Sequence, residues 1–385
     1  MAYRRRFKIA RRKRKDQLTL TRILVTINEK ANIDAAFENQ ILSSLQWIRQ
    51  KALSEKNQTL SYWDITPWRT FYRNLLNQVL APRYHAQQEI QKEALCYGSA
   101  DQVLIKPFSF SSINSMGSID FLHNKMGSAD VEKLYALMNS TQATAYEKFL
   151  IGNNQLKKST VTDFAGTAFL REHNYKKAVE WFSKSSDKGP INKNPFIDLL
   201  YDQESACAQD AKIITSKLAF AQEMQRLISS AETDKANSAK NLYKYALGLY
   251  NITYYGHTWE LVQYYRSGSD GYYVPKNATP FEREYYGAFS AKEYFEKAML
   301  ASADKNFKAR CLFMMAKCAQ KQIRRPQYDD YTTNYDQYDA ADKKYMQEFK
   351  NSPLFPQFVK EYSSTAFYKE ALTSCSYLRD FVKRR

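Results

Sequence analysis

Apolar residues recur every three or four positions through most of the chain, which is the spacing of an amphipathic α-helix. The pattern is clearest in 18–56, 68–80, 85–98, 129–140 and 144–152. Segment 101–118 departs from it, because apolar residues alternate there with Ser and Gly. With 11 Gly and 10 Pro in 385 residues, the composition favours long helices over a sandwich or barrel. We therefore predict an all-α fold.

Segment 159–190 carries a more specific pattern, STVTDFAGTAFLREHNYKKAVEWFSKSSDKGP. Six residues fall at the offsets of one tetratricopeptide repeat, a pair of antiparallel helices that stacks on copies of itself. These residues are Gly166, Phe169, Tyr175, Ala178, Phe182 and Pro190. The small residues let the helices approach, the rings fill the space between them, and proline stops the second helix. We expect all six to be structural.

The ends of the two helices also have local signals. Thr160 and Asp163 have the spacing of a capping box, which predicts that the first helix starts there. The turn between the helices is expected at His173 and Asn174, between the two apolar runs.

Weaker copies of the pattern follow. Tyr338, Ala341, Tyr345 and Pro353 repeat the spacing of the last four repeat positions. Partial repeats are expected at 236–266, 281–320 and 336–380, although ordinary amphipathic helices also produce such strings. The resulting prediction is a TPR-like α-solenoid of stacked antiparallel helix pairs, with a helical N-terminal region.

These patterns divide the chain into four parts. We expect a basic disordered arm at 1–16, a helical region at 17–100, and an irregular linker or extended segment at 101–128. The repeat domain is expected to occupy 129–385, with its clearest repeat at 159–192. No stretch of eighteen apolar residues occurs, so no transmembrane segment is predicted.

The region from about 155 to 385 resembles a bacterial group of tetratricopeptide-containing proteins with no assigned function. The likeness is carried by DFAGTAFLREHNYKKAVEWFSK, YALGLYNITYYGHTWELVQYY, AKEYFEKAMLASADKNFKARCLFMMAKCAQ and AFYKEALTSCSYLRDF. It implies a helical-repeat architecture and no particular activity. Members of the group look associated with the cell envelope, and this chain would match their C-terminal part.

The net charge of +17 is concentrated at the start of the chain. Nine basic residues and no acid occur in the first fifteen positions: Arg4, Arg5, Arg6, Lys8, Arg11, Arg12, Lys13, Arg14 and Lys15. Such a run attracts nucleic acid by counterion release, or an anionic membrane surface or other anionic polymer. A solvated terminus that aids solubility is the alternative.

Motifs for catalysis or metal binding are missing from the sequence. The four His have no metal-ligand spacing, and there is no phosphate-binding glycine loop or nucleophile elbow. The five Cys are widely spaced and are expected to be free thiols. Asp329, Asp330, Asp336 and Asp339 could hold a cation weakly or form a solvated loop. We predict neither a cofactor nor enzymatic activity.

The leading functional prediction is a scaffold that binds a protein or peptide partner in a concave groove lined by first helices. Five residues not used for packing are the candidates for this groove: Lys157, Thr162, Asp163, Thr167 and Arg171. The alternative is a nucleic-acid-associated protein that uses the basic arm. The basic start is no secretory signal, which predicts a cytoplasmic location. The cell envelope is the alternative, if the recorded start is truncated or the family likeness holds.

Overall fold

The computed structural model describes residues 2–55, 67–103, 117–185, 191–198, 200, 215–266, 273–331 and 334–384, without the side chains of 2–13 and 329. Regular structure in these residues is helical, apart from an isolated antiparallel bridge between Ile191 and Thr215. The all-α prediction is therefore confirmed for the described residues. Pro190 lies outside them. The chain divides into two compact units, Met1–Ala165 (unit 1) and Gly166–Arg385 (unit 2), whereas the sequence analysis placed a boundary at 128/129.

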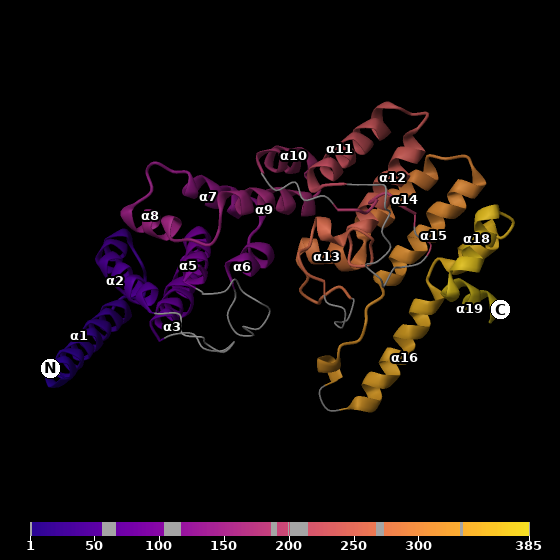
Figure 1. Cartoon of the computed structure of the whole chain (residues 1–385). Helices are drawn as coiled ribbons and strands as arrows, with labels where there is room; N and C mark the ends of the chain where they lie inside the picture. Colours follow the sequence, from indigo (N-terminus) through magenta and orange to yellow (C-terminus); the bar gives the residue numbers. More distant parts are fainter. Residues whose placement is uncertain are drawn as a thin grey trace. The chain divides into compact units, whose positions relative to one another are not determined.

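Unit 1 is built from helices of 6 to 27 residues (Figure 1), and their apolar side chains form a buried interior. Its helices are α1 (Ala2–Asn28), α2 (Ala35–Ser54), α3 (Pro67–Asn74), the π-helical η1 (Leu75–Leu80), α4 (Ala81–Ala86), α5 (Ile90–Gln102), α6 (Ser118–Lys125), α7 (Ser128–Met138) and α8 (Ala145–Gly152). α9 (Lys158–Arg171) crosses the boundary between the units. Helix α8 packs against both α2 and α5, and Leu45, Leu95 and Leu150 of these helices are fully buried.

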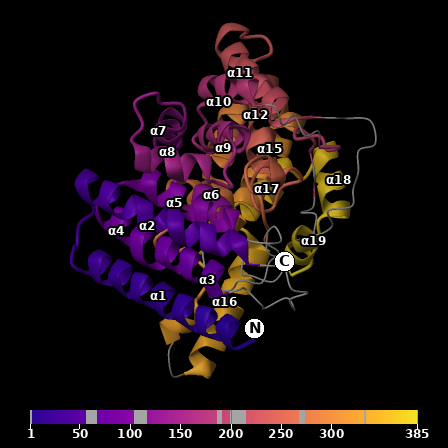
Figure 2. The ribbon, with the colours of Figure 1, turned by 60° about the vertical axis from the view of Figure 1, so that its left-hand side comes forward.

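The basic N-terminal segment is helical rather than disordered. Figure 2 shows α1 as one uninterrupted helix that includes the whole of 2–16. No Gly or Pro interrupts its 27 residues, and Arg, Lys and Ala are good helix formers. Its C-terminal half is anchored by the buried Ile23 and Ile27 and by an ion pair between Asp16 and Lys51 at 2.7 Å.

A helix also lies where an irregular linker was predicted. α6 occupies Ser118–Lys125, within the 101–128 segment, and Gly117 is its N-cap residue. The backbone N–H and the hydroxyl of Ser118 both donate to one carboxylate oxygen of Asp101, each at 2.7 Å. A contact seventeen residues back along the chain therefore supports this helix start. The prediction of an irregular segment was wrong for 118–125, and residues 104–116 lie outside the described part of the chain.

Unit 2 is built from helices that pack largely in chain order. They are α10 (Tyr175–Lys184), α11 (Lys217–Thr233), α12 (Ser238–Asn251), the 3₁₀ turn η2 (Trp259–Leu261), α13 (Pro280–Gly287), α14 (Phe289–Leu300), α15 (Lys305–Lys321), the 3₁₀ turn η3 (Tyr328–Tyr331), α16 (Tyr335–Asn351), α17 (Phe355–Tyr362), α18 (Ala366–Ser374) and α19 (Ser376–Lys383). Contacts run from α10 to α11, α12, α14 and α15 in turn (Figure 1). α15 then packs on α17 and α18.

Within the described residues, no helix is both long enough and apolar enough to cross a membrane.

The clearest sequence repeat is a helical hairpin, as predicted. α9 and α10 are joined by a turn at 172–174, in which His173 has a positive φ of 58°. Phe169, Tyr175, Ala178 and Phe182 are all buried. α9 begins at Lys158, so Thr160 lies inside the helix and is not its cap.

The weaker repeats differ from the prediction in two of three cases. Segment 281–320 contains the packed pair α14 and α15, with Ala291, Phe295 and Ala298 buried. Segment 236–266 contains α12 followed by turns and η2 rather than by a second α-helix. In 336–380 the first helix, α16, has no buried residue, so Tyr338, Ala341 and Tyr345 are not core positions. Pro353 is exposed and follows the end of that helix.

The backbone of Gly166 in α9 closely approaches the Phe182 ring of α10. A Cβ at this position would lie 2.5 Å from the Phe182 ring. Gly166→Ala should therefore lower the free energy of unfolding by about 1–3 kcal/mol despite the better helix propensity of alanine. Chemical denaturation measures the change. Gly152→Ala in α8 is the matched control, since nothing lies within 4 Å there, and it should not destabilise the protein.

Candidate functional site

The predicted groove residues of α9 are mostly inside the protein. Thr162 and Thr167 are buried, Asp163 is half-buried, and Lys157 is exposed. The Thr167 hydroxyl accepts a hydrogen bond from Lys217 Nζ at 2.9 Å, fifty residues away in sequence. Thr162 and Thr167 are therefore packing residues and not part of an open groove.

Arg171 connects α9 to the segment after η2 and to α13. Its Nε donates to the carbonyl of Val262 at 2.8 Å, and its Nη2 donates to Gln263 Oε1 at 3.0 Å. The guanidinium lies 4.3 Å from the centre of the Phe281 ring. Burial lowers the pKa of Arg171 to about 10, which still leaves the side chain charged at neutral pH. Arg171 is a structural cation rather than a groove residue.

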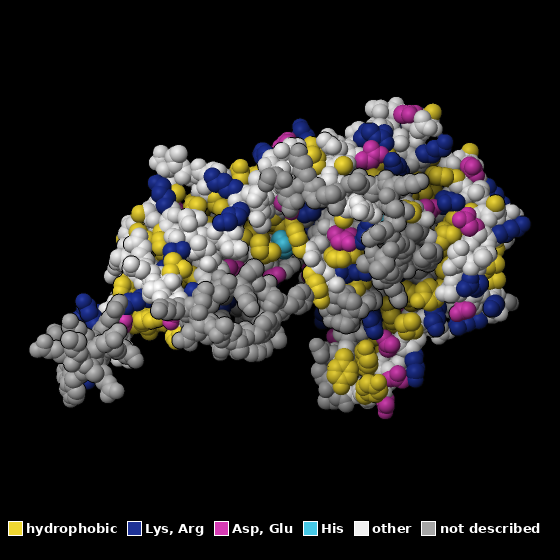
Figure 3. Space-filling view, viewed as in Figure 1, with side chains coloured by type: hydrophobic (Ala, Val, Ile, Leu, Met, Phe, Trp, Pro, Cys, Tyr) yellow, Lys and Arg dark blue, Asp and Glu magenta, His cyan; other side chains and the backbone are white. Residues whose placement is uncertain are grey.

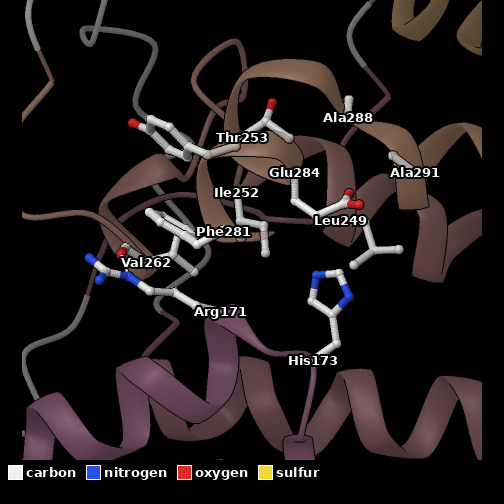
Figure 4. Close-up of a pocket in the computed structure, with 11 residues that line it drawn as sticks. Arg171, His173, Leu249, Ile252, Thr253, Val262, Phe281, Glu284, Ala288 and Ala291 are labelled. Atoms are coloured by element: carbon white, nitrogen blue, oxygen red, sulfur yellow. Dashed lines mark hydrogen bonds between the residues drawn. The ribbon is translucent and has the colours of Figure 1, made fainter. Parts of the chain in front are cut away.

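The cavity beside Arg171 is too small for a ligand (Figure 4). Its volume is about 20 Å³, enough for roughly one water molecule. Its walls include Arg171, His173, Ile252, Phe281, Glu284 and Ala291. We regard this cavity as a packing defect between α9, α12, α13 and α14.

His173 points into this cavity from the turn after α9, on the side where Glu284 lies (Figure 4). Its ring stacks on Tyr175 with a centroid distance of 6.2 Å and an interplanar angle of 9°. Burial lowers the pKa of His173, and the nearby Glu284 opposes this shift. One carboxylate oxygen of Glu284 already accepts the backbone N–H of Ser290, at 2.8 Å. The imidazole is therefore neutral in the folded protein near neutral pH.

Because burial lowers the pKa of His173, the free energy of unfolding should decrease as the pH falls. Above a pH of about 6.5, His173 is neutral in both states and burying it costs no ionisation energy. As the pH falls below that value, the unfolded chain takes up the proton first, so stability is lost. His173→Asn, which tolerates a positive φ, should lose less unfolding free energy between about pH 7 and pH 5 than the wild type. Denaturation at both pH values tests this, and equal losses would contradict it.

Metal or thiol chemistry finds no support in the described residues. Within them, no group of three or more His, Cys, Asp and Glu side chains could hold a metal ion. Cys96, Cys311 and Cys318 are buried free thiols, and Cys375 is a free thiol that is half-buried. Burial raises the pKa of Cys311 to about 12, which keeps this thiol protonated and unreactive.

Exposed aromatic residues gather at η3 and the start of α16. Tyr328 and Tyr335 are 60% and 67% exposed, and Tyr331 and Tyr338 are half-buried. The ring of Tyr338 lies 5.5 Å from Tyr328, 6.0 Å from Tyr331 and 6.4 Å from Tyr335, between centroids. We call these four residues the tyrosine surface. In Figure 3, hydrophobic and acidic side chains adjoin at this end of unit 2.

An open groove adjoins the tyrosine surface. Its volume is about 500 Å³, which is within the range of ligand and peptide sites. Charged and aromatic side chains form its walls: Arg324, Asp330, Tyr331, Lys344, Tyr345 and Glu348. Tyr331 belongs to both the surface and the groove, so a bound chain could contact the two together.

Hydrogen bonds fix both ends of α16 in the described part of the chain. Asn334 caps the helix by accepting the backbone N–H of Gln337 at 3.2 Å. The far end is fixed to α15, where Gln320 Nε2 donates to the carbonyl of Phe349 at 2.6 Å. Phe349 also meets Tyr377 of α19 at 5.5 Å. The helix is thus anchored near its C-terminus, while its first turns meet the tyrosines of η3.

Ion pairs surround the tyrosine surface. Arg324 lies 3.5 Å from Asp330, and Lys343 lies 2.6 Å from Asp339. Arg325 lies 3.7 Å from Asp342, and its guanidinium lies over the ring of Tyr345 at 5.9 Å. Burial raises the pKa of Tyr345, so its hydroxyl remains protonated beside the groove. The Arg324–Asp330 and Lys343–Asp339 pairs are solvent-exposed and individually weak, whereas Arg325 and Asp342 are half-buried.

No known protein family, curated protein or solved structure matches the chain. The likeness to bacterial tetratricopeptide-containing proteins therefore remains a prediction, and the site rests on its geometry alone.

The acidic residues predicted to bind a cation or form a solvated loop lie around the tyrosine surface. Asp330 and Asp339 pair with basic side chains, and Asp336 lies in the first turn of α16. The side chain of Asp329 lies outside the described part of the chain.

The basic residues at 4–15 are only partly described. Arg14 and Lys15 are exposed on α1, and the side chains of the others lie outside the described part. Sequence reasoning missed the tyrosine surface, although four tyrosines without an intervening apolar residue were visible at 328–338.

Proposed function

We propose that the chain is a non-enzymatic helical scaffold that binds a protein or peptide partner at the tyrosine surface and its groove. The observation that carries this proposal is the exposure of Tyr328 and Tyr335, the two most exposed aromatic side chains of the described residues, beside an open groove. Exposed aromatic patches mark interaction sites, and tyrosine is enriched at interfaces.

The architecture is compatible with a TPR-like α-solenoid. Helices α10, α11, α12, α14 and α15 pack on one another in chain order, and α9 with α10 carries the repeat pattern. A solenoid presents side chains on an extended surface without needing a catalytic centre.

Peptide display tests this proposal. A random peptide library panned on the full chain should yield enriched sequences for the wild type. Enrichment should fall at least ten-fold for the Tyr328→Ser/Tyr335→Ser variant, because two stacking rings are removed. Both side chains are exposed, so the variant should fold normally. Tyr265→Ser removes an equally exposed tyrosine outside the surface and is the matched control. Absence of enrichment with the wild type would refute the proposal.

A second candidate function is nucleic-acid binding through α1. Nine basic residues and no acid lie in the first fifteen positions of the chain, and residues 2–15 belong to the helix α1. A basic helix of this kind binds the phosphate backbone and releases counterions. The observation supports charge-based binding without sequence specificity.

Salt dependence distinguishes this candidate from a solvated terminus. Replacing Arg11, Arg12 and Arg14 with Gln should flatten the slope of log K against log salt by about 0.9 for each phosphate that is no longer neutralised. Anisotropy with labelled duplex DNA gives the slope, and heparin serves as a second anionic polymer. Replacing the exposed Lys176, Lys235 and Lys360 with Gln is the charge-matched control. Equal slopes for the two triple variants would exclude a role for α1.

A further inference from the structure

Aromatic rings in this protein are repeatedly covered by its own cations. Lys184 lies 4.2 Å from the Trp181 ring centre, Lys217 lies 4.5 Å from that of Tyr264, and Lys297 lies 4.3 Å from that of Tyr294. Trp181 is buried, Tyr294 is half-buried and Tyr264 is exposed. Such contacts stabilise by attraction between the cation and the ring face. A Lys or Arg over a ring is therefore a recurrent arrangement among the described residues.

The described rings of the tyrosine surface do not show this arrangement. In the part of the chain that the structure describes, no Lys or Arg lies over the rings of its four tyrosines. Its segment, 326–342, carries five Asp and no Lys or Arg, in a chain with a net charge of +17. Ring faces and carboxylates both favour a positive ligand.

We propose that the tyrosine surface binds a segment rich in Arg and Lys from a partner protein, whose cations lie on the rings of Tyr328 and Tyr335. The inference rests on the proposed function of this surface and adds the chemical class of the partner. Asp336, in the first turn of α16, has no ion pair among the described residues and accepts one of these cations.

The ion pairs around the surface permit this exchange. Asp330 and Asp339 are paired with Arg324 and Lys343, but all four side chains are at least 41% exposed. Exposed pairs contribute little to stability, so an incoming Arg can take over either carboxylate at small cost. Arginine should be preferred to lysine, because its planar group both stacks on a ring and pairs with a carboxylate in two hydrogen bonds.

The test uses the full chain and labelled peptides of defined charge. A fluorescein-labelled peptide of Gly-Arg-Lys repeats should bind more tightly than one of Gly-Ser-Gln repeats, as measured by anisotropy. Tyr335→Ser should weaken binding of the basic peptide about three-fold, and Tyr328→Ser/Tyr335→Ser about ten-fold. Tyr335→Phe should retain binding, because the ring face is kept. Asp336→Asn should weaken binding about two-fold and reduce its salt dependence.

Several outcomes would overturn the inference. Equal binding of the basic and neutral peptides would do so, as would equal losses with Tyr265→Ser and Tyr335→Ser. Sedimentation could show that the wild type is a dimer and the Tyr328→Ser/Tyr335→Ser variant is a monomer. The tyrosine surface would then bind a second copy of the chain, and the inference would fail. If peptide display enriches sequences without Arg or Lys, the proposed function stands and this inference fails. If display enriches nothing, both fail.

Discussion

The structure depends on aromatic rings that fill the space between helices and whose faces lie beneath several of the protein's Lys and Arg side chains. In the α9–α10 hairpin and its neighbour α12, Tyr175 is buried and its ring lies 5.9 Å from that of Tyr245. Farther along unit 2, Lys317 and Lys321 are buried on α15, with Nζ atoms 5.1 Å and 4.2 Å from the Tyr250 and Tyr255 ring centres. Aromatic rings therefore have two effects. They exclude water from the contacts between helices, and they allow a basic chain to bury the aliphatic parts of its Lys and Arg side chains.

The sequence predicts the parts of the fold that depend on neighbouring residues. Periodicity predicts helices, and the small and aromatic positions of 159–182 predict the α9–α10 hairpin, which the structure contains. Features that depend on distant residues were not predictable in this way. The start of α6 relies on Asp101, and the burial of Thr167 relies on Lys217. Neither Asp101 nor Lys217 can be identified as a partner from the spacing of residues, because the local sequence does not determine which distant side chain lies nearby in the fold.

The same limit applies to the candidate site. Tyr338 and Tyr175 occupy equivalent positions in the repeat pattern, yet Tyr175 is buried and Tyr338 is half-exposed. What differs is the surface opposite each ring: α12 supplies Tyr245 to Tyr175, while Tyr338 meets other tyrosines of η3 and α16. A repeat pattern thus predicts on which side of its helix a ring lies. It does not predict whether another helix packs against that side. The uncovered rings are the feature from which a binding role can be argued.

The close approach of Gly166 and Phe182 has an evolutionary consequence. Because the ring occupies the volume that a methyl group at 166 would need, neither position can change size independently. Homologous chains should therefore show paired replacement, with a larger residue at 166 only where 182 no longer carries a ring. Such co-variation would identify the α9–α10 hairpin in distantly related sequences, even where the other repeat positions have changed.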